Sequence, residues 1–420
     1  MKALTGVLLA QEHVNSGSIM HIITYIFWIC IALIFYNYIG YGILLLILTE
    51  VRQLFNVDNT LDNLLLDKEN LPDVTMLVAA YNEERIIEEK IANSLSLNYP
   101  VDKLSFLFIT DGSNDNTVDI IARYPRINLM HQDERKGKTA ALNRAMEQVR
   151  TSITVFCDAN TLLNRSTLRR IVSHYQNSNT GGVAGEKKIL AGRENGSAGA
   201  GEGLYWKYES LLKKLDAKLY TVTGAAGELF SIRTALWEPL PEDVILDDFV
   251  ISTRINLKGY RIAYEPGAYA SELPSASLKE EKKRKVRISA GAFQAMIMLK
   301  PLFNIFKHPV LFFQFFSHRL LRWTLVPLSF PFLLLTNTLL VIKGAGMCYT
   351  LMLIGQISFY LLALTGAYLT SHTSSLKVLK IFHYILFMNH SVYLGFFRFI
   401  RGRQSVVWEK AGREVITASN

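Results

Sequence analysis

Residues 19–48 contain no Asp, Glu, Lys or Arg, and this uninterrupted stretch is the strongest constraint on what the chain can fold into. A helix that crosses the hydrocarbon core of a bilayer needs about 20 predominantly apolar residues. A secretory signal has an apolar core of only about 7–15 residues, which favours a retained helix over a cleaved leader. We therefore predict a transmembrane helix at 19–48, preceded by a tail at 1–18 and followed by a linker at 49–69.

A second apolar block lies near the other end of the chain. Uncharged runs within 323–397 predict about three further transmembrane or re-entrant segments. Ahead of them, residues 291–322 mix aromatic and basic side chains. This mixture predicts amphipathic helices at the membrane interface, with an ordinary core helix as the alternative. A basic tail at 398–420 completes the chain.

The charge of the chain is divided unevenly. Residues 1–278 hold 27 Lys+Arg and 32 Asp+Glu, a net −5, whereas residues 279–420 hold 18 and 4, a net +14, and the two sum to +9. A basic excess beside the membrane segments predicts attraction to anionic lipid. No nucleic-acid recognition motif accompanies it, so we expect no nucleic-acid partner. Three cysteines without a C-x-x-C pair exclude a disulfide-rich domain and a cysteine zinc site.

Residues 70–290 alternate short apolar runs with polar helical stretches, which predicts an α/β domain between the membrane segments. The expected strands are 74–79, 104–110, 127–130 and 153–157. The expected helices are 83–95, 114–124, 138–149 and 166–176. Strands that alternate with helices at this spacing form a mostly parallel, Rossmann-like sheet with helices on both faces. Ligands of such sheets bind beyond the carboxyl ends of the strands, so the residues after each strand are the candidate site.

Each expected strand is followed by polar or charged residues on one predicted rim of the sheet. The four segments are Ala80-Tyr81-Asn82-Glu83, Asp111-Gly112-Ser113-Asn114-Asp115-Asn116-Thr117, Glu134-Arg135-Lys136-Gly137-Lys138-Thr139 and Asp158-Ala159-Asn160. Asp, Asn, Ser and Gly also form ordinary turns, but four such segments on one edge favour a ligand site. Asp111 and Asp158, with Asn160, could hold a hard cation that also takes phosphate oxygens, which favours Mg2+ or Mn2+ over zinc. Lys138 lies at a predicted helix N-terminus, which favours a diphosphate.

In their order and spacing, these segments resemble the membrane-embedded family 2 glycosyltransferases, which include cellulose, chitin and hyaluronan synthases and bacterial exopolysaccharide enzymes. The matching elements are Ala80-Tyr81-Asn82-Glu83, Asp111-Gly112-Ser113 with Asp115 and Thr117, Lys136-Gly137-Lys138, Asp158-Ala159-Asn160, Gly224-Ala225-Ala226-Gly227 and Leu246-Asp247-Asp248. The resemblance covers about residues 70–290. It implies a GT-A domain that transfers a sugar, with inversion, from a UDP-sugar to a growing glycan acceptor in exopolysaccharide or cell-surface polysaccharide synthesis.

The resemblance also implies roles for individual residues. Nucleotide-sugar binding would fall to Tyr81, Glu83, Asp111, Lys138, Asp158, Arg284 and Arg287. The metal would fall to Asp158 and Asn160, acceptor contacts to Gly224, Gly227 and Asp247, and the role of general base to Asp248. Because Asp247 lies beside Asp248, we expect the pKa of Asp248 to be raised, which suits a base that works near neutral pH. An acid pair that stabilises a helix N-terminus is the alternative, and both interpretations can hold.

Two positions depart from the family pattern. Asn160 replaces the second acid of the D-x-D motif, so we expect weaker metal binding. Ile288 replaces the tryptophan that follows the two family arginines, which argues against the synthesis of long chains. The alternative function is therefore the transfer of one sugar to a lipid-linked polyprenyl phosphate acceptor. A non-catalytic scaffold subunit is a third hypothesis, and the basic residues of 279–287 could also serve attraction to lipid.

These features predict a multi-pass protein of the plasma (inner) membrane with its catalytic domain in the cytoplasm. Membrane lipid and polysaccharide export proteins would then be partners. Trp408 and Arg413 loosely resemble a C-terminal element that contributes to a gate over the substrate pocket in related synthases. Three spans after the domain would put the C-terminus outside, whereas the basic tail favours the inside. The sequence leaves that side open.

Overall fold

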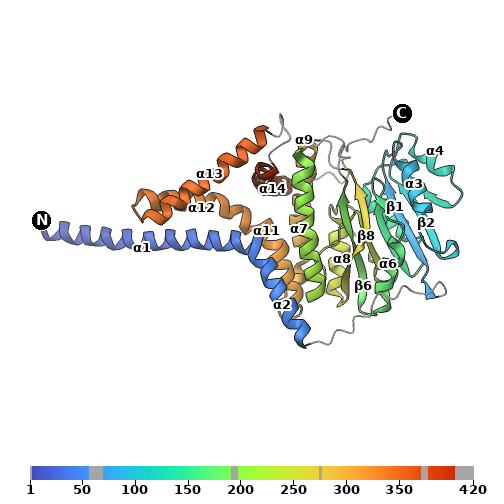
Figure 1. Ribbon diagram of the computed structural model, residues 1–420, viewed down its shortest axis with the longest axis horizontal. Helices are drawn as coiled ribbons and strands as arrows, with labels where there is room; N and C mark the ends of the chain where they lie inside the picture. The colour runs from blue at the N-terminus through green and yellow to red at the C-terminus, as the bar shows by residue number, and fades with distance from the viewer. Residues whose placement is uncertain (1, 56–69, 191–196, 274–276, 370–376, 403–420) are drawn as a thin grey trace. The chain divides into compact units, whose positions relative to one another are not determined.

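The computed structural model describes residues 2–55, 70–190, 197–273, 277–369 and 377–402 (Figure 1). The chain forms two compact units. One comprises Met1–Ile43 and Phe316–His390, and the other comprises Leu44–Phe315 and Ser391–Asn420. We call them the helical unit and the sheet unit.

The sheet unit contains an eight-stranded sheet within the described residues. Its strands are β1 (Val74–Ala80), β2 (Leu104–Thr110), β3 (Ile127–Met130), β4 (Ile153–Asp158), β5 (Leu162–Leu163), β6 (Thr180–Ile189), β7 (Leu229–Arg233) and β8 (Arg261–Glu272). They lie in the order β3-β2-β1-β4-β7-β6-β8-β5. The pairs β1–β2, β1–β4, β2–β3 and β6–β8 are parallel, whereas β7 is antiparallel to both of its neighbours. The predicted α/β class with a mostly parallel sheet is confirmed.

Nine α-helices lie wholly or mostly within the described residues of the sheet unit. They are α2 (Tyr41–Phe55), α3 (Ile87–Leu95), α4 (Thr117–Ala122), α5 (Lys138–Met146), α6 (Thr167–Ser173), α7 (Ser197–Leu219), α8 (Asp247–Leu257), α9 (Leu278–Met298) and α10 (Pro309–Phe315). The helices α3 to α6 follow the strands in the predicted alternation. The first of them starts four residues later than expected, because Glu83 belongs to a turn that precedes it.

The core explains this layering. Alternate residues of β1 and β2, such as Met76, Val78, Phe106 and Phe108, form one buried cluster with apolar residues of α3, α4 and α6. Helix α5 packs against the same two strands and contributes nothing to that cluster, which places it on the opposite face. Every residue of β1 is buried, as expected for a central parallel strand covered on both faces. This burial holds the carboxyl ends of β1, β2 and β4 on one edge.

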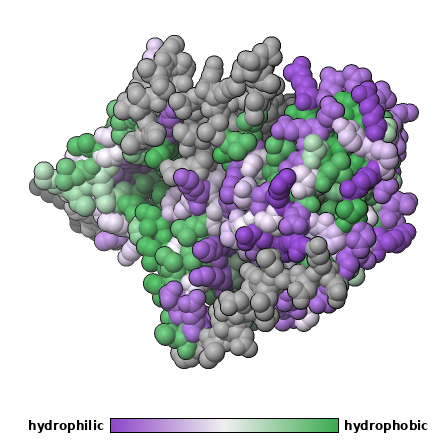
Figure 2. All heavy atoms as spheres, turned by 45° about the vertical axis from the view of Figure 1, so that its right-hand side comes forward, coloured by the Kyte–Doolittle hydropathy of each residue, from purple (hydrophilic) through white to green (hydrophobic). Residues whose placement is uncertain are grey.

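The helical unit is built from long apolar helices. They are α1 (Lys2–Phe35), α12 (Leu325–Ile342), α13 (Met347–Leu369) and most of α14 (Lys377–Ile400), with short π-helical segments at Tyr36–Gly40 and Phe316–Leu320 and a three-residue α11 (Leu321–Trp323). Helix α1 packs against α12, and α12 packs against α13. Three stretches of the described residues are long and apolar enough to cross a membrane: Ser18–Leu54, Leu325–Ile342 and Met347–Tyr368. Apolar side chains gather over these helices in Figure 2.

The third apolar run predicted before the C-terminus forms part of α14, which is not among those three stretches. Polar side chains interrupt it. Asn389 donates a hydrogen bond to the hydroxyl of Tyr38 at 2.8 Å, which satisfies an amide inside an apolar helix. The predicted gate residues Trp408 and Arg413 lie outside the described residues, so that prediction stands as it was.

Candidate active site

The loops after β1 and β2 are linked by hydrogen bonds. The backbone N–H of Asn82 donates to Ser113 at 3.1 Å, and its side chain donates to Asn114 at 2.7 Å. The backbone N–H of Glu83 donates to the hydroxyl of Thr117 at 2.8 Å. Asn82 has a φ of 53°, the one positive value among non-glycine residues in the described part of the chain. Asn tolerates this conformation, which lets the chain turn sharply at the end of β1.

Asp111 organises the segment that follows β3. Its carboxylate is buried and accepts backbone N–H groups from Lys136 at 3.0 Å and from Gly137 at 2.6 Å. Gly137 has a φ of 100°, a value that L side chains rarely adopt, and it directly precedes α5. Asp111 therefore holds the turn that presents Lys138 at the start of that helix. The predicted contact of Asp111 with a nucleotide stays a prediction.

Arg135 was not among the predicted site residues. Its guanidinium carbon lies 3.6 Å from the ring centroid of Tyr81, a cation–π contact on the proposed nucleotide-binding tyrosine. Gly112 makes room for it, since a Cβ at Gly112 would lie 2.7 Å from the Cβ of Arg135. The position of Arg135 next to Lys136, in the segment already singled out, is the signal that could have found it.

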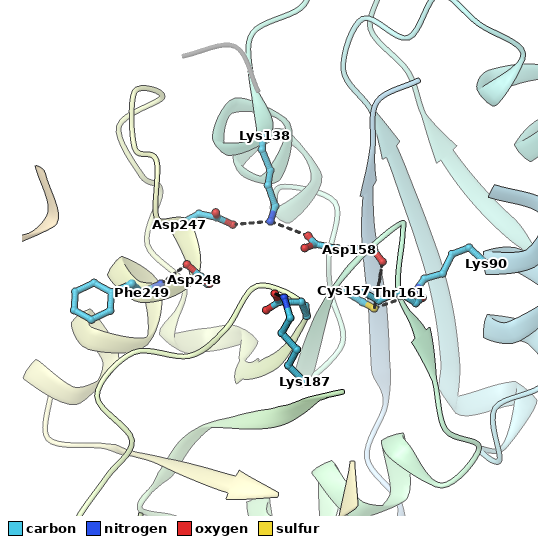
Figure 3. Close-up of polar contacts among 10 residues, drawn as sticks. Lys90, Lys138, Cys157, Asp158, Thr161, Lys187, Asp247, Asp248 and Phe249 are labelled. Carbon is cyan, nitrogen blue, oxygen red and sulfur yellow. Dashed lines mark hydrogen bonds and ion pairs between the residues drawn. The ribbon is translucent and has the colours of Figure 1, made fainter. Parts of the chain in front are cut away.

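Three of the predicted site residues meet around one ammonium group. Lys138 Nζ lies 3.0 Å from Asp158 Oδ1 and 3.4 Å from Asp247 Oδ2 (Figure 3). Burial works to lower the pKa of Lys138, but attraction to Asp158, Asp247 and Asp248 outweighs it and raises the pKa. Lys138 therefore stays protonated. The structure brings together residues from β4, α5 and α8, of which Lys138 and Asp247 are 109 positions apart in the sequence.

Asp248 lies at the first turn of α8, and Figure 3 shows its carboxylate beside the same cluster. Burial and, next, repulsion by Asp247 raise its pKa to about 7, while Lys138 opposes the rise. This is the direction that the sequence predicts. One carboxylate oxygen accepts the backbone N–H of Phe249 at 2.7 Å, so the helix N-terminus also orients the group. Burial also raises the pKa of Asp158.

The two predicted acceptor glycines differ in their surroundings. A Cβ at Gly227 would lie 3.3 Å from Asp248 Oδ2 and 3.5 Å from Lys138 Nζ, so this glycine adjoins the acids directly. Gly224 has a φ of 87°, and a Cβ there would lie 2.2 Å from the ring of Phe249. Gly224 thus packs against the first turn of α8. Its predicted contact with an acceptor stays a prediction.

The two arginines on α9 also differ. Arg284 is paired with Glu281 by two hydrogen bonds of 3.0 and 3.1 Å. Burial lowers the pKa of Arg287, and Asp247 and Asp158 attract its charge. Arg287 is therefore electrostatically linked to the acid cluster. Ile288, which stands where the family has tryptophan, is half-buried beside it.

The residues fit a divalent cation that takes most of its ligands from a substrate. Asp158 is partly accessible, with 22% of its side chain exposed, and Asn160 is also partly exposed two residues further on. No group of three or more His, Cys, Asp and Glu side chains that could hold a metal occurs in the described parts of the chain. Mg2+ typically binds through one or two carboxylates together with substrate phosphates and water, and one carboxylate plus one amide oxygen matches that pattern.

A mostly parallel sheet with acids and a lysine gathered at its strand ends defines a GT-A glycosyltransferase fold. Residues 75–232 match the family model described as Glycosyl transferase family 2. Residues 75–232 are therefore the part of the chain that matches a family 2 glycosyltransferase domain, as the sequence motifs predict.

Relatives with this domain include poly-beta-1,6-N-acetyl-D-glucosamine synthases. That of Staphylococcus aureus (strain COL) is 28% identical over 250 residues, which cover 57% of this chain and 58% of the relative. That of Staphylococcus epidermidis is 24% identical over 292 residues, which cover 66% of this chain and 67% of the relative. The chain thus spans less than two thirds of the length of the first of these relatives.

A solved structure shares the fold over nearly the whole chain. It is a mannosyltransferase from Pyrobaculum calidifontis in complex with GDP-Man and Mn2+, and it aligns with a TM-score of 0.65 at 21% identity. The alignment covers 90% of this chain and 99% of that chain. At this identity the likeness shows the fold alone.

Proposed function

We propose that this protein is an inverting glycosyltransferase that moves a sugar from a UDP-sugar to a growing glycan acceptor at the membrane. The observation that carries the proposal is the cluster in which Lys138 contacts Asp158 and Asp247, with Asp248 beside it and its pKa raised to about 7. A base whose pKa lies near the working pH transfers protons most efficiently. The synthase relatives support polysaccharide synthesis as the process.

In the proposed reaction, Asp248 accepts the proton of the acceptor hydroxyl. The hydroxyl oxygen forms a bond to the anomeric carbon of the donor sugar, and the bond from that carbon to the diphosphate oxygen breaks. One displacement inverts the anomeric configuration. Gly227 has no side chain, so the acceptor can approach Asp248 closely at that point.

The leaving diphosphate carries negative charge that the site must stabilise. Lys138 and Arg287 are the cations of this chain that lie in the field of the acids, and they would bind that charge as it develops. Asp158 and Asn160 would hold Mg2+ or Mn2+, which supplies further positive charge to the diphosphate when bound. The Mn2+ bound to the mannosyltransferase of like fold supports this choice of ion.

The nucleoside would lie over the loops after β1 and β2, against Tyr81, Glu83 and Asp111. Glu83 is buried, and both carboxylate oxygens of Asp111 already accept backbone N–H groups, so the half-buried ring of Tyr81, paired with Arg135, offers the stacking surface. Aromatic and arginine planes stack on bases of any kind. UDP is favoured by the family resemblance.

We also propose that the protein is a multi-pass protein of the plasma membrane, with the sheet unit in the cytoplasm. The three apolar stretches that are long enough to cross a bilayer support this location. The same proposal includes a glycan or lipid-linked acceptor, membrane lipid and polysaccharide export proteins as partners of this protein. Nucleotide sugars are cytoplasmic substrates in this scheme, and the growing glycan would leave through the membrane.

A second candidate is the transfer of one sugar to a lipid-linked acceptor. Ile288 supports it, because this position lacks the ring that would support a chain of sugars. The two candidates differ in product length. Purified full-length protein in nanodiscs, incubated with a labelled donor and membrane lipid extract, would give long polymer under the first and a single lipid-linked sugar under the second.

A donor screen tests the proposal itself. UDP-glucose, UDP-N-acetylglucosamine, UDP-galactose, UDP-glucuronate and GDP-mannose would each be offered with Mg2+, with Mn2+ and with EDTA. We expect transfer from one UDP-sugar, stimulated by a divalent cation. Transfer from GDP-mannose alone would contradict the proposed nucleotide, and no transfer from any donor would support the scaffold hypothesis instead.

A further inference from the structure

The sheet unit contains a buried lysine that the proposed reaction does not use. Lys90 lies on α3 and is 0% exposed. Its Nζ donates hydrogen bonds to the carbonyl oxygen of Thr161 at 2.7 Å and to Cys157 Sγ at 2.8 Å (Figure 3). Cys157 and Thr161 flank the segment that carries Asp158 and Asn160. All the contacts of this ammonium are therefore with the two ends of the proposed diphosphate-binding segment.

In the part of the chain that the structure describes, this ammonium has no carboxylate partner. Among the described residues, no Asp or Glu lies within ion-pair distance of Lys90, and Asp158 points its carboxylate to Lys138 instead. A buried charge is strongly unfavourable unless polar groups compensate it. Here the compensation comes from neutral acceptors of one short segment, so that segment has to stay closed around the ammonium.

Further hydrogen bonds close the same segment. The hydroxyl of Thr161 donates to the carbonyl oxygen of Asp158 at 2.9 Å and lies 3.2 Å from Cys157 Sγ. Asn93, on the same face of α3 as Lys90, exchanges two hydrogen bonds of 2.8 Å with the backbone of Leu163. Lys90 thus holds the turn that contains the ligands, and Asn93 holds the strand after it.

We propose that Lys90 is a positioning residue, whose buried ammonium fixes the turn from Cys157 to Thr161 so that Asp158 and Asn160 face the donor diphosphate. This inference rests on the proposed function and names a residue that acts on the diphosphate end of the donor. Loss of Lys90 leaves the Thr161 carbonyl oxygen and Cys157 without their donor, and the turn relaxes. The nucleoside end is secured separately, by the hydrogen bonds between the loops after β1 and β2.

The test compares two ligands in one variant. Full-length Lys90→Met protein in nanodiscs would be titrated with UDP and with uridine, both in the presence of Mn2+, by calorimetry. We expect UDP affinity to fall about 10–100-fold, the range found when a residue that orients a ligand-binding group is lost. Uridine affinity should change less than about twofold, because uridine has no diphosphate. Donor KM should rise accordingly.

Asn93→Ala is the matched control, because it removes two hydrogen bonds from the same helix face without touching the turn. It should lower the melting temperature but leave the ratio of UDP to uridine affinity unchanged. Lys90→Gln is the second variant, in case methionine prevents folding. Glutamine can donate a hydrogen bond but carries no charge, and we expect it to lower UDP affinity selectively as well.

The outcomes separate this inference from the proposed function. If the wild-type protein prefers UDP to uridine but Lys90→Met weakens both equally, or neither, the positioning role is wrong while the proposed function stands. The positioning role is also wrong if Asn93→Ala causes the same selective loss of UDP affinity. It is wrong, too, if both Lys90 variants fail to fold, because Lys90 would then only stabilise the core. In both cases the proposed function stands. If the wild-type protein binds no nucleotide, both proposals fail.

Discussion

The sheet unit contains two clusters in which one lysine faces two carboxylates, and they differ in their charge balance. In the first, Lys138 pairs with Asp158 and Asp247, and Asp248 adds a third acid nearby. In the second, Lys187 pairs with Glu228 at 2.5 Å and with Glu272. The Lys138 cluster has more carboxylates than cations. In the Lys187 cluster, Arg284 is a second cation that attracts Glu228, so the charges are more nearly matched.

As a result, the pKa of one carboxyl group in each cluster is shifted, and the two shifts have opposite directions. Although burial acts to raise it, the pKa of Glu228 is held well below its usual range by Lys187. Burial and Asp247 raise the pKa of Asp248 to about 7. With its pKa lowered in this way, Glu228 stays ionised near neutral pH and serves the fold. A cluster with one acid too many keeps a group that can exchange a proton near neutral pH, as catalysis requires.

The largest expected effect is that of Asp248→Asn. Removing the base should lower the rate of transfer by about 10²–10⁴-fold, because the acceptor hydroxyl loses its proton acceptor. UDP affinity should change little, since Asp248 faces the acceptor in the proposed site. Transfer assays and UDP titration on the same preparation would check both parts. An Asp248→Asn protein that transfers sugar at the wild-type rate would show that Asp248 is not the base.

Lys138→Met should have the next largest effect. It removes a cation from the leaving diphosphate, a loss that typically costs about 10²–10³-fold in kcat for a single electrostatic contact. It also removes the attraction that lowers the pKa of Asp248, so the pH midpoint of activity should move up from about 7. Kinetics across pH would show both changes. An unchanged midpoint would mean that Lys138 and Asp248 are not coupled.

Much of this contrast could be predicted from the sequence, but the matched cluster could not. The alternation of apolar runs and helices predicted β1 to β4, and Asp158, Asp247 and Asp248 came from the order of the motifs. The strands β6 and β8 were not predicted, because glycines at 182 and 185 and Pro266-Gly267 interrupt them. Their sheet partners are set by tertiary packing rather than by local pattern.

Buried lysines were also missed, for a physical reason. Lys90 follows two glutamates in a helix, a pattern that is typical of a solvent-exposed helix face. Lys187 lies in a strand next to Lys188, and nothing in that local sequence indicates that one of the two points at Glu228 and Glu272. A charge in a core needs partners from distant segments, and only the folded chain shows them.

The pH dependence of the acid-rich cluster is a third, smaller effect. Asp248 must be ionised to act as base, so kcat/KM should fall about tenfold per pH unit below about 7. Because Asp247 helps to raise the pKa of Asp248, Asp247→Asn should move this midpoint down. A pH–rate profile of both proteins would measure the shift. A midpoint that stays in place would show that Asp247 does not contribute to the raised pKa of Asp248.

The same group should leave a signature in stability. The folded pKa of Asp248 is raised, so its contribution to the free energy of unfolding is fully present below the pKa of the unfolded chain, near 4, and is lost as the pH rises through about 7. Asp248→Asn abolishes this titration. The variant should therefore lose less thermal stability than the wild-type protein between pH 5 and pH 8, as thermal melts would record.

Lys187→Met should have the smallest effect on transfer and a large one on folding. Breaking one partner of a buried ion pair costs about 3–5 kcal/mol, because Glu228 and Glu272 would keep uncompensated charge in the core. Activity per folded molecule should stay within about threefold of the wild type, since Lys187 pairs with Glu228 and Glu272 and not with Asp248. Denaturation curves and active-site-normalised rates would measure both. A selective loss of activity at full stability would mean that the matched cluster also takes part in catalysis, and the two clusters would then be one extended site.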